Sequence, residues 1–416
     1  MRSTNMRSPL LIISLFLLML SGCNTASNMT HEVSSWFKTD TSRIPKTNYA
    51  QPREVTQGME SPGTSPTTPV TSEPLDTFGR NKMVPAGAPS VVRVGLLLPL
   101  TGKNAALGKS FQDAAQMAVN DLSADNFELI PKDTNLLPGS AARAAIDEGA
   151  QLIIGPIFSD ATAEVKTAVN GKVPVITLSN DTTLGGNNTY VFGFNPTQQV
   201  LRALQYAKTR NIQTIAILAP ISVYGDIAIA AANASGIKIS NIERYTSSKD
   251  SIKKAVAAIS AKRGEIQGIL LPDGGSTLAN VATELTTVAL SSHDIPIIGT
   301  GLWDEQDMHK YSVLVGGFYA APDPAKLSRF IARFQKAYGS KPVRLASLAY
   351  DATAMAAVLA KQGKSFDEQT LTNHNGFTGL DGIFRLNTDG LAERGLAILE
   401  VTISGTRLID ASPKQF

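Results

Sequence analysis

Short apolar runs alternate with helical stretches from Val91 onward. The runs are rich in Ile, Leu and Val and lack polar alternation, which is the pattern of strands covered on both faces of a parallel sheet. They read VVRVGLLLPL, QLIIGP, VPVITLS, IQTIAILAP, IQGILLP and IPIIGTG. The sequence therefore predicts an α/β fold with parallel sheets flanked by helices.

Several runs end in Pro or Gly before a polar loop, as at Pro99, Pro156 and Pro220. Ligands of open parallel sheets bind beyond the carboxyl ends of the strands. Functional residues are therefore expected in these loops.

The first loop, in VGLLLPLTGKNAALGKSFQDA, looks like a phosphate-binding P-loop because Gly108-Lys109-Ser110 opens a helix. The nearest preceding glycine is Gly102, which makes the loop one residue too long for that motif. We interpret Thr101 and Gly102 instead as a turn at the edge of a cleft. Lys109 and Ser110 are then expected to be a solvated helix start.

The N-terminus has the pattern of an export signal, with Arg2 and Arg7 before an apolar run from Leu10 to Leu20. The run is too short to cross a hydrocarbon core, which needs about 20 helical residues. The segment Leu20-Ser21-Gly22-Cys23 then resembles a bacterial lipobox. Residues 1–22 are therefore expected to be a lipoprotein signal peptide, and acyl chains on Cys23 would anchor the protein without a membrane span.

Export has consequences for the compartment and its chemistry. An exported chain meets no ATP pool, which removes the ligand of a P-loop as well. Cys23 is the only cysteine, so no intrachain disulfide can form. The expected location is the periplasm with a lipid anchor, and Asn24 after the lipidated residue favours the outer membrane over the inner one.

Residues 23–90 differ in composition from the rest of the chain. The stretch SPGTSPTTPVTSEPLD combines prolines with small polar residues and has too few apolar side chains to offset the entropy of ordering. This segment is predicted to be a disordered, extended linker. A folded domain is expected over residues 91–416.

Composition and motifs exclude several classes of function. The formal net charge of +3 carries no basic block, so nucleic-acid binding is not expected. The chain lacks a Gly-x-Ser-x-Gly elbow, a His-Glu-x-x-His motif and a cysteine nucleophile. Its four histidines are isolated from one another, whereas zinc ligands usually come in close pairs. The sequence therefore predicts a protein that is not an enzyme and has neither a metal site nor a cofactor.

Four stretches resemble the leucine/isoleucine/valine-binding family of type 1 periplasmic binding proteins. They read VGLLLPLTGKNAALGKSFQDAAQMAVND, GAQLIIGPIFSDATAEVKTAV, VPVITLSND and SVYGDIAIAAA. Within that superfamily, LLLPLTGK, IIGPIFSD and GTGLWDEQDM on a lipidated chain look most like the penicillin-binding protein activator lipoproteins. The resemblance implies two α/β lobes joined by three crossovers, with a cleft between them. One lobe would hold about 91–195 and 322–384, and the other about 196–321 and 385–416.

The resemblance also implies which residues would bind a ligand in the cleft. Ser159 to Thr162 match the hydroxyls and amides that hold a ligand carboxylate, although Ser159 could equally be a helix cap. Ser179 and Asp181 match the next ligand loop. Asp181 stands where the family usually has Thr, and its carboxylate would repel that of an amino acid.

Three further residues of the other lobe match this family's ligand site. Tyr224 fits the aromatic residue that closes over the ligand. Asp304, next to Trp303, stands where relatives hold an acidic partner for the ligand amino group, and Trp303 could alternatively pack between the lobes.

Two functions remain open on these grounds. The first is a non-catalytic regulator that contacts a peptidoglycan synthase, that is, a penicillin-binding protein. The second is the receptor of an ABC permease for branched-chain amino acids or a similar small solute, which would close on its ligand. The long linker after Cys23 and the carboxylate of Asp181 favour the regulator.

Overall fold

The computed structural model describes residues 91–122, 126–304 and 307–416. The expected signal peptide, the lipidated Cys23 and the expected linker lie outside these ranges. The structure therefore describes the expected folded domain and not its anchor.

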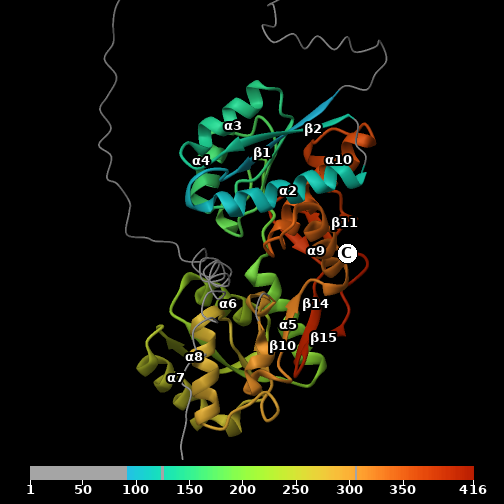
Figure 1. Cartoon of the computed structure of the whole chain (residues 1–416). Helices are drawn as coiled ribbons and strands as arrows, with labels where there is room; N and C mark the ends of the chain where they lie inside the picture. The colour runs from blue at the N-terminus through green and yellow to red at the C-terminus, as the bar shows by residue number, and fades with distance from the viewer. Residues whose placement is uncertain (1–90, 123–125, 305–306) are drawn as a thin grey trace, which may run out of the picture. The chain divides into compact units, whose positions relative to one another are not determined.

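A first lobe is built on a five-stranded sheet with strand order β2-β1-β3-β4-β5, all parallel (Figure 1). Helices α2 and α10 pack on one face of β1, and α3 and α4 pack on the other. The strands are β1 (Val92–Leu98), β2 (Phe127–Asp133), β3 (Leu152–Ile154), β4 (Val175–Thr177) and β5 (Thr189–Val191). The helices are α2 (Ala105–Leu122), α3 (Pro138–Asp147), α4 (Ser159–Val169), α9 (Pro324–Tyr338) and α10 (Ala346–Lys361).

A second lobe is built on a seven-stranded sheet with strand order β15-β14-β10-β9-β8-β6-β7. Helices α5 and α6 cover one face, and α7 and α8 cover the other. The strands are β6 (Thr214–Pro220), β7 (Lys238–Tyr245), β8 (Gly268–Leu270), β9 (Ile297–Gly299), β10 (Phe318–Ala321), β14 (Ala397–Thr402) and β15 (Gly405–Asp410). The helices are α5 (Pro196–Thr209), α6 (Val223–Ala234), α7 (Lys249–Ala261) and α8 (Gly275–Thr287).

The strand interiors explain why these runs form sheets covered on both faces. Every residue of β3, β4, β8 and β9 is buried, as expected for short Ile- and Leu-rich strands between two helical layers. The α/β fold with helix-flanked parallel strands is therefore confirmed. The sheet of the second lobe differs in one respect, because β14 and β15 run antiparallel at its edge.

The chain passes between the two sheets three times: from β5 to β6, from β10 to α9, and from β13 to β14. A small antiparallel sheet of β11 (Phe377–Gly379), β12 (Gly382–Leu386) and β13 (Ala392–Arg394) precedes the last passage. It packs on the core of the first lobe through Phe384, Leu386 and Ala392. The last passage therefore follows Arg394, beyond the expected boundary at 384, because β12 stays paired with β11 and β13.

No helix within residues 91–122, 126–304 and 307–416 combines the length and the apolar character that a membrane span requires.

Candidate functional site

The loop after β1 is held by the end of the neighbouring strand β2. The Asp133 carboxylate accepts hydrogen bonds from the Leu100 amide at 2.8 Å and from the Thr101 hydroxyl. Burial raises the pKa of Asp133, but the hydrogen bonds from Thr101 and from backbone amides outweigh it and lower the pKa. Gly102 has a φ of +72°, a left-handed conformation in which glycine is unstrained. Thr101 and Gly102 thus form a fixed turn at the carboxyl end of the sheet.

The residues that suggest a P-loop have structural roles in α2. Gly108 lies so close to the first strand that a Cβ there would be 2.1 Å from the Pro99 carbonyl oxygen. Lys109 pairs with Asp113 one turn along the helix. The Ser110 hydroxyl accepts a hydrogen bond at 3.0 Å from the Val343 amide. Ser110 is therefore not simply solvated, which differs from the expectation based on the sequence.

The residues expected to hold a ligand carboxylate lie at the start of α4. Phe158 is the N-cap, and Ser159 is the first helical residue, so its side chain does not cap the helix. Thr162 is fully buried, and its hydroxyl lies 2.8 Å from the Phe158 carbonyl oxygen and 2.7 Å from the Thr177 hydroxyl. Ser159 is half-buried, whereas Thr162 belongs to the protein interior.

The next expected ligand loop follows β4. The Asp181 carboxylate caps a short 3-10 turn, η2 (Thr182–Leu184), by accepting from the amide and the hydroxyl of Thr183 at 3.0 and 2.7 Å. The Ser179 hydroxyl accepts the Asp181 amide at 3.2 Å. Thr177 accepts the Ser179 amide, which joins this loop to the Thr162 hydroxyl in the first lobe.

Tyr224 and Trp303 lie together in the second lobe. The Tyr224 hydroxyl donates to the Thr300 hydroxyl at 2.8 Å and lies 3.4 Å from Gln199 Oε1. Burial raises the pKa of Tyr224 well above its usual range. Trp303, in η4 (Gly301–Trp303), is fully buried in the core of this lobe with its ring 6.0 Å from that of Tyr319. Trp303 therefore packs within one lobe rather than between the two.

Asp304 connects the second lobe to the first. Its carboxylate accepts a hydrogen bond at 2.9 Å from Nε of Arg344, which lies between α9 and α10. Arg344 also lies 3.2 Å from the Asp381 carboxylate and donates to the Ser347 hydroxyl at 3.0 Å. The carboxylate expected to meet a ligand amino group thus meets a guanidinium of the same chain.

The structure contains a cluster of buried charged side chains around Asp351 that was not predicted from the sequence. Asp351 is 1 % exposed in α10 and lies 3.9 Å from Nη1 of Arg394, next to Asp381. The Arg394 guanidinium lies over the ring of Phe192 at 4.2 Å and donates to the Phe192 carbonyl at 3.1 Å. Burial, and then the charge of Asp381, raise the pKa of Asp351 to about 7. A lone carboxylate within the apolar stretch SLAYDATAMAAVLA was the available signal.

The candidate residues therefore form two groups, one in each lobe. Ser159, Thr162, Ser179 and Asp181 belong to the first lobe, and Tyr224 and Trp303 to the second. Asp304 is the residue of the set that contacts the other lobe, through Arg344. Within the described part of the chain, no group of three or more His, Cys, Asp or Glu side chains is placed to hold a metal ion.

Residues 91–407 match the periplasmic binding protein family, so the chain belongs to this family. The family is one of binding proteins of the periplasm or cell envelope.

Two curated relatives match parts of the chain. An uncharacterised protein of Rickettsia prowazekii is 25% identical over 177 residues, covering 41% of this chain and 47% of that protein. The penicillin-binding protein activator LpoA of Photobacterium profundum is 29% identical over 137 residues, covering 32% of this chain and 22% of that protein. The matches thus span less than half of the length of either relative.

Two solved structures illustrate the similarity of fold. A putative branched-chain amino acid ABC transporter protein from Rhodospirillum rubrum gives a TM-score of 0.67 at 17% identity, covering 77% of this chain and 100% of that chain. Full-length LpoA from Haemophilus influenzae gives a TM-score of 0.61 at 17% identity, covering 77% of this chain and 59% of that chain. The two-lobed type 1 periplasmic binding protein fold is therefore shared with receptors and with a penicillin-binding protein activator.

Proposed function

We propose that this chain is a non-catalytic envelope lipoprotein whose periplasmic binding protein domain regulates a peptidoglycan synthase. The anchor would be the acylated Cys23, in the outer membrane, and residues 23–90 would be the tether that lets the domain reach its partner. The partial sequence similarity to a penicillin-binding protein activator supports this branch of the family.

The observation that carries the proposal is the internal use of the expected ligand-binding groups. Asp181 caps its own turn, Tyr224 is bonded to Thr300, and Asp304 is paired with Arg344. A receptor with a micromolar dissociation constant needs about 8 kcal/mol of binding free energy. Groups that must first leave internal partners supply little of it, because each exchange of hydrogen bonds is worth only about 1 kcal/mol.

A receptor of an ABC permease is the second candidate. Its supporting observation is that the described domain covers the whole length of the putative branched-chain amino acid transporter protein from Rhodospirillum rubrum. The half-buried Ser159 at the start of α4 would be its first contact with a ligand carboxylate.

Binding to a bifunctional peptidoglycan synthase tests the proposal. Purified full-length chain should bind the purified synthase in detergent and raise its rate of glycan polymerisation. A Cys23→Ser chain should retain this binding in solution while losing its attachment to membranes, which separates the role of the domain from that of the anchor. Capture of a permease in place of the synthase would support the receptor.

A further inference from the structure

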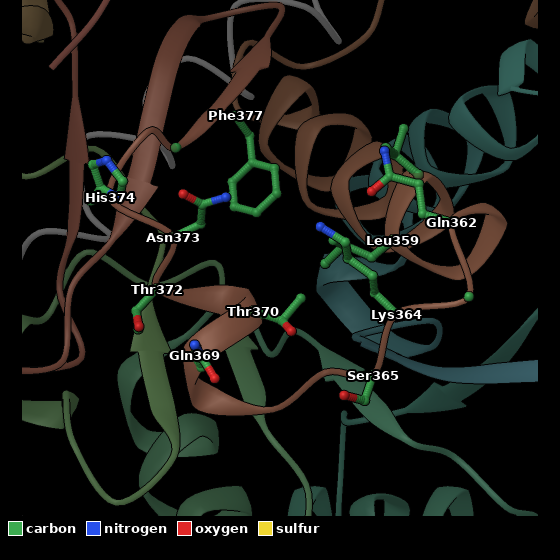
Figure 2. A pocket seen from close by; sticks show the side chains of 13 residues that line it. Leu359, Gln362, Lys364, Ser365, Gln369, Thr370, Thr372, Asn373, His374 and Phe377 are labelled. Atoms are coloured by element: carbon green, nitrogen blue, oxygen red, sulfur yellow. The ribbon is translucent and has the colours of Figure 1, made fainter.

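A pocket of about 910 Å³ lies in the first lobe, away from the candidate residues at the strand ends. It lies between the C-terminal end of α10 and the segment that runs through α11 (Glu368–Leu371) into β11. Figure 2 shows the Lys364 side chain and the Asn373 amide directed into the space beside the ring of Phe377. The volume is within the range of about 300–1,000 Å³ that is usual for small-molecule sites.

The side chains that line the pocket include basic residues but no acidic ones. Lys364 and His374 are its basic residues, and none of its thirteen residues is Asp or Glu. Lys364 has no ion-pair partner among the described residues, as is the case for most lysines there, which leaves its ammonium group available. The nearby Asp367 carboxylate is turned to the Ser365 hydroxyl and the Thr370 amide. The pocket therefore offers one unpaired ammonium group and no competing carboxylate.

The backbone that carries Lys364 is fixed by the end of α10. The Gly363 amide donates to the Ala360 carbonyl at 3.0 Å, and the Lys364 amide donates to the Leu359 carbonyl at 2.9 Å. This pair of bonds, with Gly363 at a φ of +68°, is the Schellman termination of a helix. The backbone at Lys364 is thus held by the helix end, while the side chain is solvent-exposed.

Several polar groups that line the pocket already form hydrogen bonds within the protein, and the groups that remain available include hydrogen-bond donors. The Ser365 and Thr372 hydroxyls donate to Asp367 and to the Glu368 carbonyl. Asn373 Oδ1 accepts the Asn375 amide at 3.1 Å, which leaves the Nδ2 hydrogens to face the pocket. With the amides of Gln362 and Gln369, the available groups favour a ligand rich in acceptor oxygens.

We propose that this pocket binds a saccharide that carries a carboxylate. Lys364 would pair with the carboxylate, and the side-chain amides would bond to hydroxyl or acetamido oxygens. The ring of Phe377, stacked on Phe384 at 5.6 Å, provides the flat apolar surface on which the C–H face of a sugar packs. The inference does not rest on the proposed function, because it concerns a different part of the first lobe.

Titration calorimetry on the full-length chain tests the inference. N-acetylmuramic acid is the probe, N-acetylglucosamine is the same sugar without the carboxylate, and lactate is the carboxylate without the sugar. The acidic sugar should bind with a dissociation constant of about 1 mM or tighter. The two partial ligands should bind at least tenfold more weakly.

Variants locate the site. Lys364→Gln should weaken binding of N-acetylmuramic acid to the level of N-acetylglucosamine, and Gln369→Ala should weaken both sugars. Lys361→Gln, at the end of α10 but outside the lining, should change neither by more than twofold. Equal binding of acidic and neutral sugars, or an unchanged affinity in Lys364→Gln, would overturn the inference. Glucuronic acid and glucose repeat the comparison on a second sugar. Failure of both N-acetylmuramic acid and glucuronic acid to bind would also overturn it.

Discussion

Asp351 and its neighbours form a buried cluster with unequal charge. Three carboxylates, on Asp304, Asp351 and Asp381, face two guanidinium groups, on Arg344 and Arg394. The Asp351 oxygens accept the amides of Leu380 and Asp381 at 2.7 and 3.3 Å. Burying a net charge is costly, and uptake of a proton is the usual way in which a protein avoids that cost.

The raised pKa of Asp351 predicts a pH dependence of stability. An unfolded Asp has a pKa of about 3.9, whereas the folded group has a pKa of about 7. Between these values the folded chain binds more protons, so the stability that this group contributes is full below about pH 4 and is lost as the pH rises through about 7. Asp351→Asn stays neutral, so its free energy of unfolding should rise relative to wild type across this window. Urea unfolding of both proteins at several pH values measures the difference.

A matched control separates this effect from general changes of charge. Asp250→Asn, at the exposed start of α7, should keep the pH dependence of the wild type. Parallel stability curves for wild type and Asp351→Asn between pH 4 and 7 would contradict the assignment.

Two equivalent elements, β1–α2 and β6–α6, share a glycine in the helix that packs on a proline at the strand end. A Cβ on Gly108 would lie 2.1 Å from the Pro99 carbonyl oxygen, and a Cβ on Gly225 would lie 2.2 Å from that of Pro220. Both helices can begin directly over their strand ends only because these positions lack a side chain. The glycines in LGKS and VYGD are therefore explained by packing, with no need for a phosphate.

Alanine at either glycine should destabilise the protein. Alanine favours a helix by about 1 kcal/mol over glycine, but forcing a methyl group against a carbonyl costs about 1–3 kcal/mol or more. We expect Gly108→Ala and Gly225→Ala to lower the midpoint of urea unfolding. Gly264→Ala, where nothing lies within 4 Å of the new Cβ, should leave it unchanged. A higher midpoint for Gly108→Ala would show that the backbone at Pro99 moves to make room for the methyl group, and would contradict this prediction.

Sequence patterns predicted the buried strands of this fold, but not its strands of mixed burial or the ion pairs of Asp304 and Asp351. The buried parallel strands follow from local runs of Ile, Leu and Val, which act through neighbours in sequence. The β11–β13 sheet and β15 have mixed burial, so no such run marks them. The partners of Asp304 and Asp351 lie tens of residues away, at Arg344 and Arg394, and only the fold brings them together.

The expected binding residues stay a prediction, and their contacts could not be predicted for a related reason. Family position predicted the loops in which Asp181, Tyr224 and Asp304 lie, but their hydrogen-bond partners depend on tertiary packing. Thr162 and Trp303 are interior residues for the same reason, since a strand or helix register decides which side chain faces the core.

At the scale of the whole molecule, Arg344 is an ionic link between the lobes. It leaves the first lobe and bonds to Asp304 of the second, and the side chains of the pair are only 12% and 14% exposed. Removing one partner of a buried ion pair costs about 3–5 kcal/mol, because the other charge stays buried without compensation.

Arg344→Met should therefore lower the free energy of unfolding by about 3 kcal/mol. The matched control is Arg93→Met, whose pair with Glu128 is 46% and 55% exposed and should be worth less than about 1 kcal/mol. Denaturant unfolding of the three proteins provides the comparison. Equal losses in the two variants would show that the link between the lobes is no stronger than a surface pair.

Melting the full-length chain with leucine, isoleucine or valine distinguishes a regulator from an amino-acid receptor. A ligand at a hundredfold excess over its dissociation constant stabilises a protein by about 2.7 kcal/mol, which shifts a melting curve visibly. With Asp181, Tyr224 and Asp304 held by internal partners, we expect no shift at millimolar concentrations of any of the three. A clear upward shift with leucine that disappears in Ser159→Ala would contradict the account and identify the protein as a receptor.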